Sequence, residues 1–146
     1  MLDTDESGIY VNKWQTSPVV MQIKLSATAN LIDGNSQRSS VAAAMQIWNA
    51  QLGTLQFSPQ LSAPGAYSTS NGINEIVMDS TVDGEAFPSG VLAVTAIYGK
   101  GNATTETDIV FNTAYTWNSY RSFLLFGRED IQRVAIHELG HALGLN

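Results

Sequence analysis

The sequence contains no cysteine, which excludes disulfide bonds, cysteine-ligated metal sites and a thiol nucleophile. Basic residues are also few: seven Lys and Arg stand against 13 Asp and Glu, for a formal net charge of −6. Phosphate binding requires a basic surface, and an anionic membrane repels an acidic one, so we expect neither nucleic acid nor a membrane as a partner. No apolar run reaches the length that spans a bilayer.

The remaining composition is that of one globular domain. Hydrophobic residues make up 44% of the 146 residues and charged residues 14%, and this length suffices for a single hydrophobic core. No repeat or linker divides the chain, so we expect one domain over residues 1–146 that begins with a loose acidic tail at residues 1–9. That tail lacks the basic and apolar segments of a signal peptide. Either the protein is intracellular or its signal has been removed.

Hydrophobic periodicity predicts both strands and helices, and hence an α+β chain. Alternating or continuous apolar positions predict five strands, at residues 19–25, 55–57, 74–78, 91–98 and 108–112. Apolar positions at spacings of three and four predict two helices, from Ser39 or Ser40 to about Leu52 and from Arg128 to Leu143, the second capped by Asp130. Loop and turn are expected where Ser, Gly, Pro and Thr accumulate, at residues 58–72 and 99–106.

The second helix ends in the most specific pattern of the chain, which begins with His137 and Glu138 and continues to His141. Histidines four residues apart lie one turn apart on the same helical face, so both imidazoles can reach one metal ion. Glu138 is then placed to act on a water molecule bound to that metal. In the longer zinc-protease form of this motif, a Gly in the position of Gly144 turns the chain sharply and a third His follows three residues later. That third ligand would stand at position 147, one residue after Asn146.

Two other interpretations of the motif are weaker. Two surface histidines at a helix end would need no metal, but His137 and His141 are the only histidines of the chain and have the ligand spacing. A zinc enzyme whose third ligand is a distant Glu is disfavoured by Gly144, which belongs to the three-histidine form. The pattern therefore predicts a metal site.

With three weaker stretches in the same order, the motif resembles the matrixin-like branch of the metzincin zinc endopeptidases. These stretches are an Ala-rich helix followed by Trp at residues 41–49, an edge strand at residues 90–95 and a strand at residues 107–111. The likeness covers roughly residues 10–146. It implies a zincin-like α+β fold, a twisted mixed five-stranded sheet with two main helices. The family's lower subdomain follows the third His, so the chain corresponds to the upper subdomain only.

The resemblance implies hydrolysis of peptide bonds in a protein or peptide substrate. His137 and His141 would bind one catalytic zinc ion, and Glu138 would take the proton of a zinc-activated water and pass it to the leaving amine. The extended substrate would pair with the edge strand, through Val91, Leu92, Ala93, Val94 and Thr95. The second, structural zinc of animal matrixins is not expected, since no other His is present.

Two protein ligands are fewer than a catalytic zinc site uses, because such sites combine three of them with a water. We therefore expect the chain as written to bind zinc weakly or not at all and to have little protease activity, the intact protein being the active form. The face on which a lower subdomain would dock is expected to be apolar and to favour self-association. A broad endopeptidase is also expected to be secreted, after removal of its signal.

Two further interpretations remain open. The oxygen-rich loop at residues 79–85 could hold calcium, although it lacks the full spacing of the helix-loop-helix calcium motif and solvated turns have the same composition. A non-catalytic binding or structural module could retain the same fold. Such a module has no physical need for Glu138 between two metal ligands, and this favours the enzyme.

Overall fold

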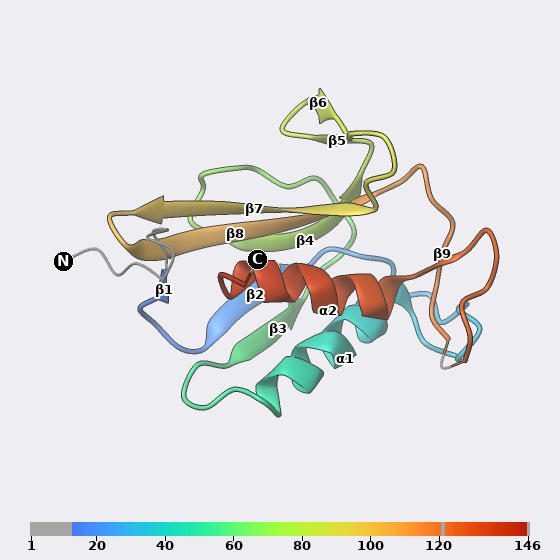
Figure 1. The fold of residues 1–146 in the computed structure, drawn as a ribbon, viewed down its shortest axis with the longest axis horizontal. Coiled ribbons are helices and arrows are strands. Elements are labelled where there is room, and N and C mark those ends of the chain that lie inside the picture. The colour runs from blue at the N-terminus through green and yellow to red at the C-terminus, as the bar shows by residue number, and fades with distance from the viewer. Residues whose placement is uncertain (1–12, 121, 146) are drawn as a thin grey trace.

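The computed structural model describes residues 13–120 and 122–145, so the tail predicted at residues 1–9 lies outside the described residues. A mixed six-stranded sheet forms one layer and two helices form the other (Figure 1). In that view α1 lies beside β3 and α2 lies between α1 and β7, and the two helices pack against each other. Within the described part of the chain, no helix is long and apolar enough to cross a membrane.

The six strands of the main sheet are β1 (Lys13–Trp14), β2 (Val19–Ile23), β3 (Phe57–Leu61), β4 (Asn74–Asp79), β7 (Ala93–Lys100) and β8 (Ala103–Asn112). The pairs β3–β2, β2–β4, β4–β8 and β1–β8 are parallel, whereas β7 pairs with β8 in the antiparallel sense. In this order β7 is the outermost strand on its side of the sheet, with one edge not paired to another described strand. Two short ladders lie apart from the sheet, β5 (Thr81–Val82) with β6 (Glu85–Ala86) and β9 (Trp117–Asn118) with β10 (Glu129–Asp130).

The two helices begin at polar caps and bury their apolar faces. Helix α1 (Gln37–Asn49) starts after Ser36, whose Oγ accepts a hydrogen bond from Ser39 N at 3.1 Å. Helix α2 (Ile131–Ala142) starts after Asp130, whose Oδ1 accepts from Gln132 N at 3.0 Å. Between helices and sheet lies the core, whose fully buried members include Met21, Ile23, Val41, Met45, Ile76, Ile109, Phe111, Ile131 and Leu139.

Indole groups fix the position of α2. Trp48 Nε1 at the end of α1 donates to Ile136 O at 2.8 Å, and Trp14 Nε1 donates to Ala142 O at 2.8 Å. Gly140 lets the helices approach closely, because a Cβ at this position would lie 3.3 Å from Trp48 Cζ2. The helix that contains the His-Glu-x-x-His motif is therefore held from both its middle and its end.

The α+β architecture with two main helices and a mixed sheet is confirmed, and all five expected strands form. The two-residue strand β1 is an additional, sixth member. The turn expected at residues 99–106 is wrong, since β8 already begins at Ala103 and pairs with the end of β7. The loop expected from residue 58 is also wrong at its start, because β3 continues through Pro59. Proline is tolerated there since β3 is an edge strand, where one side needs no N–H donor.

Candidate metal centre

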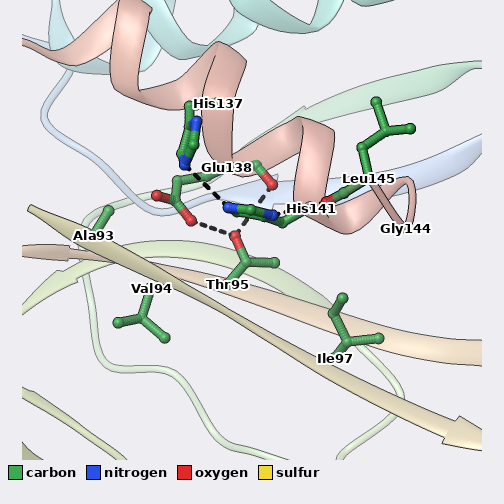
Figure 2. Close-up of a pocket in the computed structure, with 9 residues that line it drawn as sticks. All are labelled: Ala93, Val94, Thr95, Ile97, His137, Glu138, His141, Gly144 and Leu145. Atoms are coloured by element: carbon green, nitrogen blue, oxygen red, sulfur yellow. Dashed lines mark hydrogen bonds between the residues drawn. The ribbon is translucent and has the colours of Figure 1, made fainter. Parts of the chain in front are cut away.

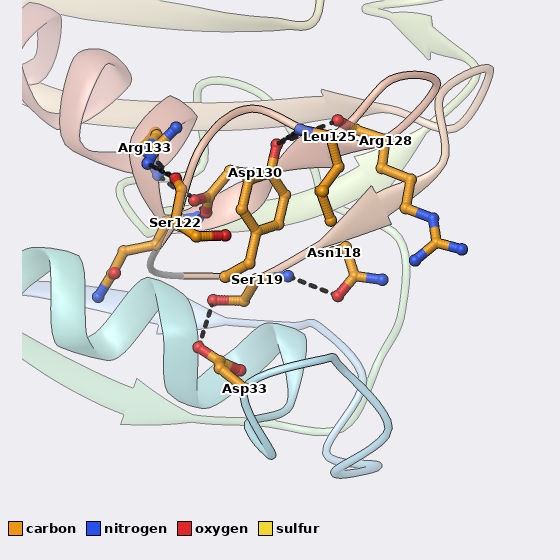
Figure 3. A network of polar contacts seen from close by, with 10 residues as sticks. Asp33, Asn118, Ser119, Ser122, Leu125, Arg128, Asp130 and Arg133 are labelled. Carbon is orange, nitrogen blue, oxygen red and sulfur yellow. Dashed lines mark hydrogen bonds and ion pairs between the residues drawn. The ribbon is translucent and has the colours of Figure 1, made fainter.

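The segment before α2 is tied to the helix by polar contacts, which set where the helix begins (Figure 3). Tyr120 Oη donates to Arg128 O at 3.3 Å. Arg133, in the first turn of α2, donates from Nη2 to Ser122 O at 2.8 Å, and its Nε lies 3.4 Å from Asp130 Oδ2. Asp130 thus caps the helix and pairs with Arg133. This start fixes the phase of the helix and hence the direction in which the later motif points.

The two histidines converge at their Nε2 atoms. His137 and His141 lie one turn apart on α2, with Nε2 atoms 3.0 Å apart and ring planes at 86° (Figure 2). His141 Nδ1 lies 2.8 Å from Leu145 O. A carbonyl oxygen only accepts, so Nδ1 carries the hydrogen of this bond and a neutral His141 has its lone pair on Nε2. That tautomer is the one a metal ligand requires.

The spacing of the imidazoles fits a shared metal ion. Two nitrogen ligands at 2.0–2.1 Å from a tetrahedral zinc ion are separated by about 3.3 Å, close to the distance between the two Nε2 atoms here. No third side chain completes the set in residues 13–120 and 122–145, where no group of three or more His, Asp or Glu could hold a metal ion. The described residues therefore supply two ligands to this centre.

Glu138 lies beside the histidines with its side chain in the cleft. The residue is only 5% exposed, and its Oε2 lies 2.6 Å from the hydroxyl of Thr95 on β7. Burial of a carboxylate is unfavourable unless it accepts hydrogen bonds, so the contact with Thr95 is part of what keeps Glu138 in this place. The structure thus brings His137, Glu138 and His141 together at the edge of the sheet.

The end of α2 turns at Gly144. This glycine has φ +88°, its N–H donates to His141 O at 2.8 Å, and Leu145 N donates to Gly140 O at 3.0 Å. These two bonds are those of a Schellman ending, in which a glycine adopts the left-handed conformation just past the helix. The turn brings Leu145 O to the ring of His141. The chain after the helix therefore passes the imidazoles instead of running away from them.

A cleft of about 410 Å³ separates the helix from the edge strand. It is lined by Ala93, Val94, Thr95, Ile97, His137, Glu138, His141, Gly144 and Leu145 (Figure 2). An adjoining hollow of about 370 Å³ is lined by Leu92, Ala93, Arg133, Val134, His137 and Glu138. Of the strand residues singled out in the sequence, four line these two spaces. The fifth, Val91, precedes β7, and its carbonyl accepts a hydrogen bond from Asn112 Nδ2 at 3.0 Å.

Two carboxylates of the loop considered for calcium, Asp79 and Asp83, make hydrogen bonds within the protein. Asp79 Oδ1 accepts from Ser80 N at 2.6 Å, and Asp83 lies within 3.1 and 3.3 Å of the hydroxyls of Tyr67 and Tyr98. The calcium interpretation stays a prediction.

A comparison with known protein families gives a match over nearly the whole chain. The matrixin family model matches residues 13–146, a range that includes both helices and every strand of the sheet. No curated protein matches the sequence. Matrixins are metalloproteases that generally use zinc and calcium and are typically secreted. Because the match extends over nearly the entire sequence and includes the histidine motif of α2, the chain belongs to the matrixin family.

Proposed function

We propose that this protein is a zinc-dependent endopeptidase in which His137 and His141 bind the metal and Glu138 is the general base. The observation that supports this most directly is the approach of the two imidazole Nε2 atoms to 3.0 Å beside a buried carboxylate. Membership of the matrixin family supports the same class of reaction. Like other matrixins, the protein is proposed to act after secretion.

Each residue has a role that follows from its contacts. The hydrogen bond between His141 and Leu145 O orients the imidazole and keeps its Nε2 lone pair free for a metal. A bound zinc ion would supply Lewis acidity, which polarises the scissile carbonyl and acidifies water. Glu138, adjacent to His137 and facing the cleft, would accept the proton of that water and deliver it to the leaving amine. A carboxylate suits both transfers because it can gain and lose a proton near neutral pH.

The substrate is proposed to be an extended polypeptide that pairs with the outer edge of β7. That edge is not paired to a described strand, and Ala93, Val94 and Thr95 border the cleft from it. Main-chain hydrogen bonds to such an edge bind a peptide without regard to its sequence, and neighbouring hollows select its side chains. The peptide would then cross the cleft opposite the two histidines.

The third zinc ligand is proposed to stand at position 147. The turn at Gly144 directs the chain past His141, and catalytic zinc sites use three protein ligands. The test compares the 146-residue chain with a version extended through residue 147 and the natural sequence that follows it, and with the same extended version carrying Ala at position 147. We expect residue 147 to be His, and only the extended chain that retains it to bind one equivalent of zinc tightly and to hydrolyse casein.

The role of Glu138 is tested in the same extended chain. Glu138→Gln should retain one zinc ion and lose at least about 100-fold in kcat, because the amide cannot accept a proton. Glu129→Gln, a partly exposed residue before α2, is the matched control and should keep full activity. An extended chain with His at position 147 that binds no zinc and cuts no peptide would refute the proposal. That result would favour a non-catalytic binding module.

A further inference from the structure

The hydroxyl of Thr95 makes two contacts with the same residue. Its Oγ1 lies 2.6 Å from Glu138 Oε2 and 3.1 Å from Glu138 O (Figure 2). Thr95 belongs to β7 and Glu138 to α2, so these contacts join the strand and the helix across the cleft. A separation of 2.6 Å is typical of a hydroxyl that donates to an ionised carboxylate.

The direction of the hydrogen bond follows from the groups involved. An ionised carboxylate and a carbonyl only accept, so the Thr95 hydroxyl is the donor in both contacts. Its single proton points to Oε2 at the shorter distance, with the carbonyl as a second, longer acceptor. Within the described part of the chain, this is the hydrogen bond that the Glu138 carboxylate makes. The Thr95 hydroxyl thus contacts both the carboxylate and the carbonyl oxygen of Glu138, and holds the side chain close to the main chain of the same residue.

The strand that contains Thr95 is held firmly in the sheet. β7 pairs with β8 along its whole length, and Thr95 lies opposite Ile109 in that ladder. Its neighbours on the same side of the strand are Ala93 and Ile97, which also line the cleft but have no polar side-chain atom. Among these three cleft residues, Thr95 alone can hydrogen-bond to Glu138 through its side chain.

We propose that Thr95 is a positioning residue, whose hydroxyl holds the Glu138 carboxylate in the orientation needed for proton transfer in the cleft. This inference rests on the proposed role of Glu138 as general base. A glutamate has three rotatable side-chain bonds, and without the contact its carboxylate would distribute over several rotamers. Proton transfer requires one of these rotamers. Loss of the Thr95 hydroxyl should therefore lower kcat and leave substrate binding at β7 unchanged.

Two substitutions at position 95 separate the hydroxyl from packing. Thr95→Val removes the hydroxyl at nearly the same volume, and Thr95→Ser keeps the hydroxyl but removes the methyl group. In the chain extended with His at position 147, we expect Thr95→Val to lower kcat about 10- to 100-fold with KM within twofold. Thr95→Ser should recover most of that loss. Thr107→Val is the matched control: Thr107 is buried on β8 and donates to Ala96 O at 3.1 Å, so kcat should not change.

A second readout needs neither zinc nor activity. In the metal-free 146-residue chain labelled with ¹³C-glutamate, the Glu138 carboxyl signal is assigned by its absence in Glu138→Gln. We expect Thr95→Val to shift and broaden this signal, while Thr95→Ser and Thr107→Val leave it in place. An unchanged signal in Thr95→Val, or equal losses of kcat in Thr95→Val and Thr95→Ser, would overturn the positioning role. If the extended chain with Thr95 intact has no activity, the proposed function fails instead, and the inference falls with it.

Discussion

At the scale of single residues, a cluster of carboxyl groups under the loop before β4 links stability to pH. Asp108 and Glu106 of β8 and Glu75 of β4 are all at most 2% exposed. Burial, together with the nearby charges of Glu106 and Glu75, raises the pKa of Asp108 to about 7. Burial also opposes ionisation of Glu75, but hydrogen bonds from Lys24 and the loop lower the pKa of Glu75 below its usual value.

The raised pKa of Asp108 means that the folded state loses stability as pH rises. The folded protein binds this proton more tightly than the unfolded chain, whose Asp pKa is about 4. The contribution of protonated Asp108 to the free energy of unfolding is therefore fully present below about pH 4 and is lost as pH rises through about 7. Asp108→Asn keeps the Oδ1 acceptor of Glu75 N and cannot ionise. We expect it to reduce the fall in the free energy of unfolding between pH 5 and pH 8.

Urea denaturation at these two pH values measures the effect. The exposed Glu85 provides the control, because Glu85→Gln removes a carboxylate that is not buried and should leave the pH dependence as in the unaltered protein. Equal pH dependence in Asp108→Asn and in the unaltered protein would show that Asp108 is ionised in the fold throughout this range.

At the scale of elements, the start of α2 depends on Asp130. This residue is 4% exposed, and its Oδ1 accepts from Gln132 N and Arg133 N at 3.0 and 3.4 Å. Removing an N-cap side chain costs about 0.5–2 kcal/mol of stability. We expect Asp130→Ala to lower the free energy of unfolding by this amount in urea, and Asp130→Asn, which keeps a capping oxygen, to lower it by less. Equal losses in the two variants would assign the effect to the pair with Arg133 instead of the cap.

The elements also show what periodicity can predict. Apolar spacings of three and four identify both helices, and the cap of α2 follows from an Asp before an apolar run. The pattern predicts that the first helix begins at Ser39 or Ser40, but α1 begins at Gln37 after the cap Ser36, because several Ser residues lie here and only contacts decide which of them caps the helix. The apolar pattern also does not predict the first half of β8, for another reason. Its Thr and Glu residues are polar, and they are buried through the cluster of carboxyl groups and the pairing with β7.

At the scale of the whole molecule, the site combines contacts within one helix with contacts between elements that are distant in the sequence. The spacing of His137 and His141 along one helix predicts their convergence without knowledge of the fold. The contact between Thr95 and Glu138 depends on how α2 packs against β7, and so does the shape of the cleft. Such contacts join residues distant in sequence, and no local pattern encodes them. The sequence therefore predicts the convergence of His137 and His141 but not the contact between Thr95 and Glu138.

The surface of the whole molecule combines a negative net charge with an apolar loop before α2. Phe123, Leu124 and Phe126 are 93%, 75% and 105% exposed, and together they form a contiguous apolar segment. We expect this segment to promote self-association, which the net charge of −6 opposes. Sedimentation velocity should then show more dimer as protein concentration increases and as salt screens the repulsion.

Replacing the two aromatic residues tests which surface is responsible. We expect the double variant Phe123→Ser and Phe126→Ser to remain monomeric at concentrations where the unaltered chain associates, since it removes the largest exposed apolar side chains of the loop. Leu61→Ser is the matched control, because Leu61 is 58% exposed on the edge strand β3 and should not affect the dimer. If the double variant associates as strongly as the unaltered chain, the contact lies elsewhere, and the surface around Leu145, just after α2, becomes the one to alter next. A response to salt in the opposite direction would show that charge attraction, and not apolar contact, holds the copies together.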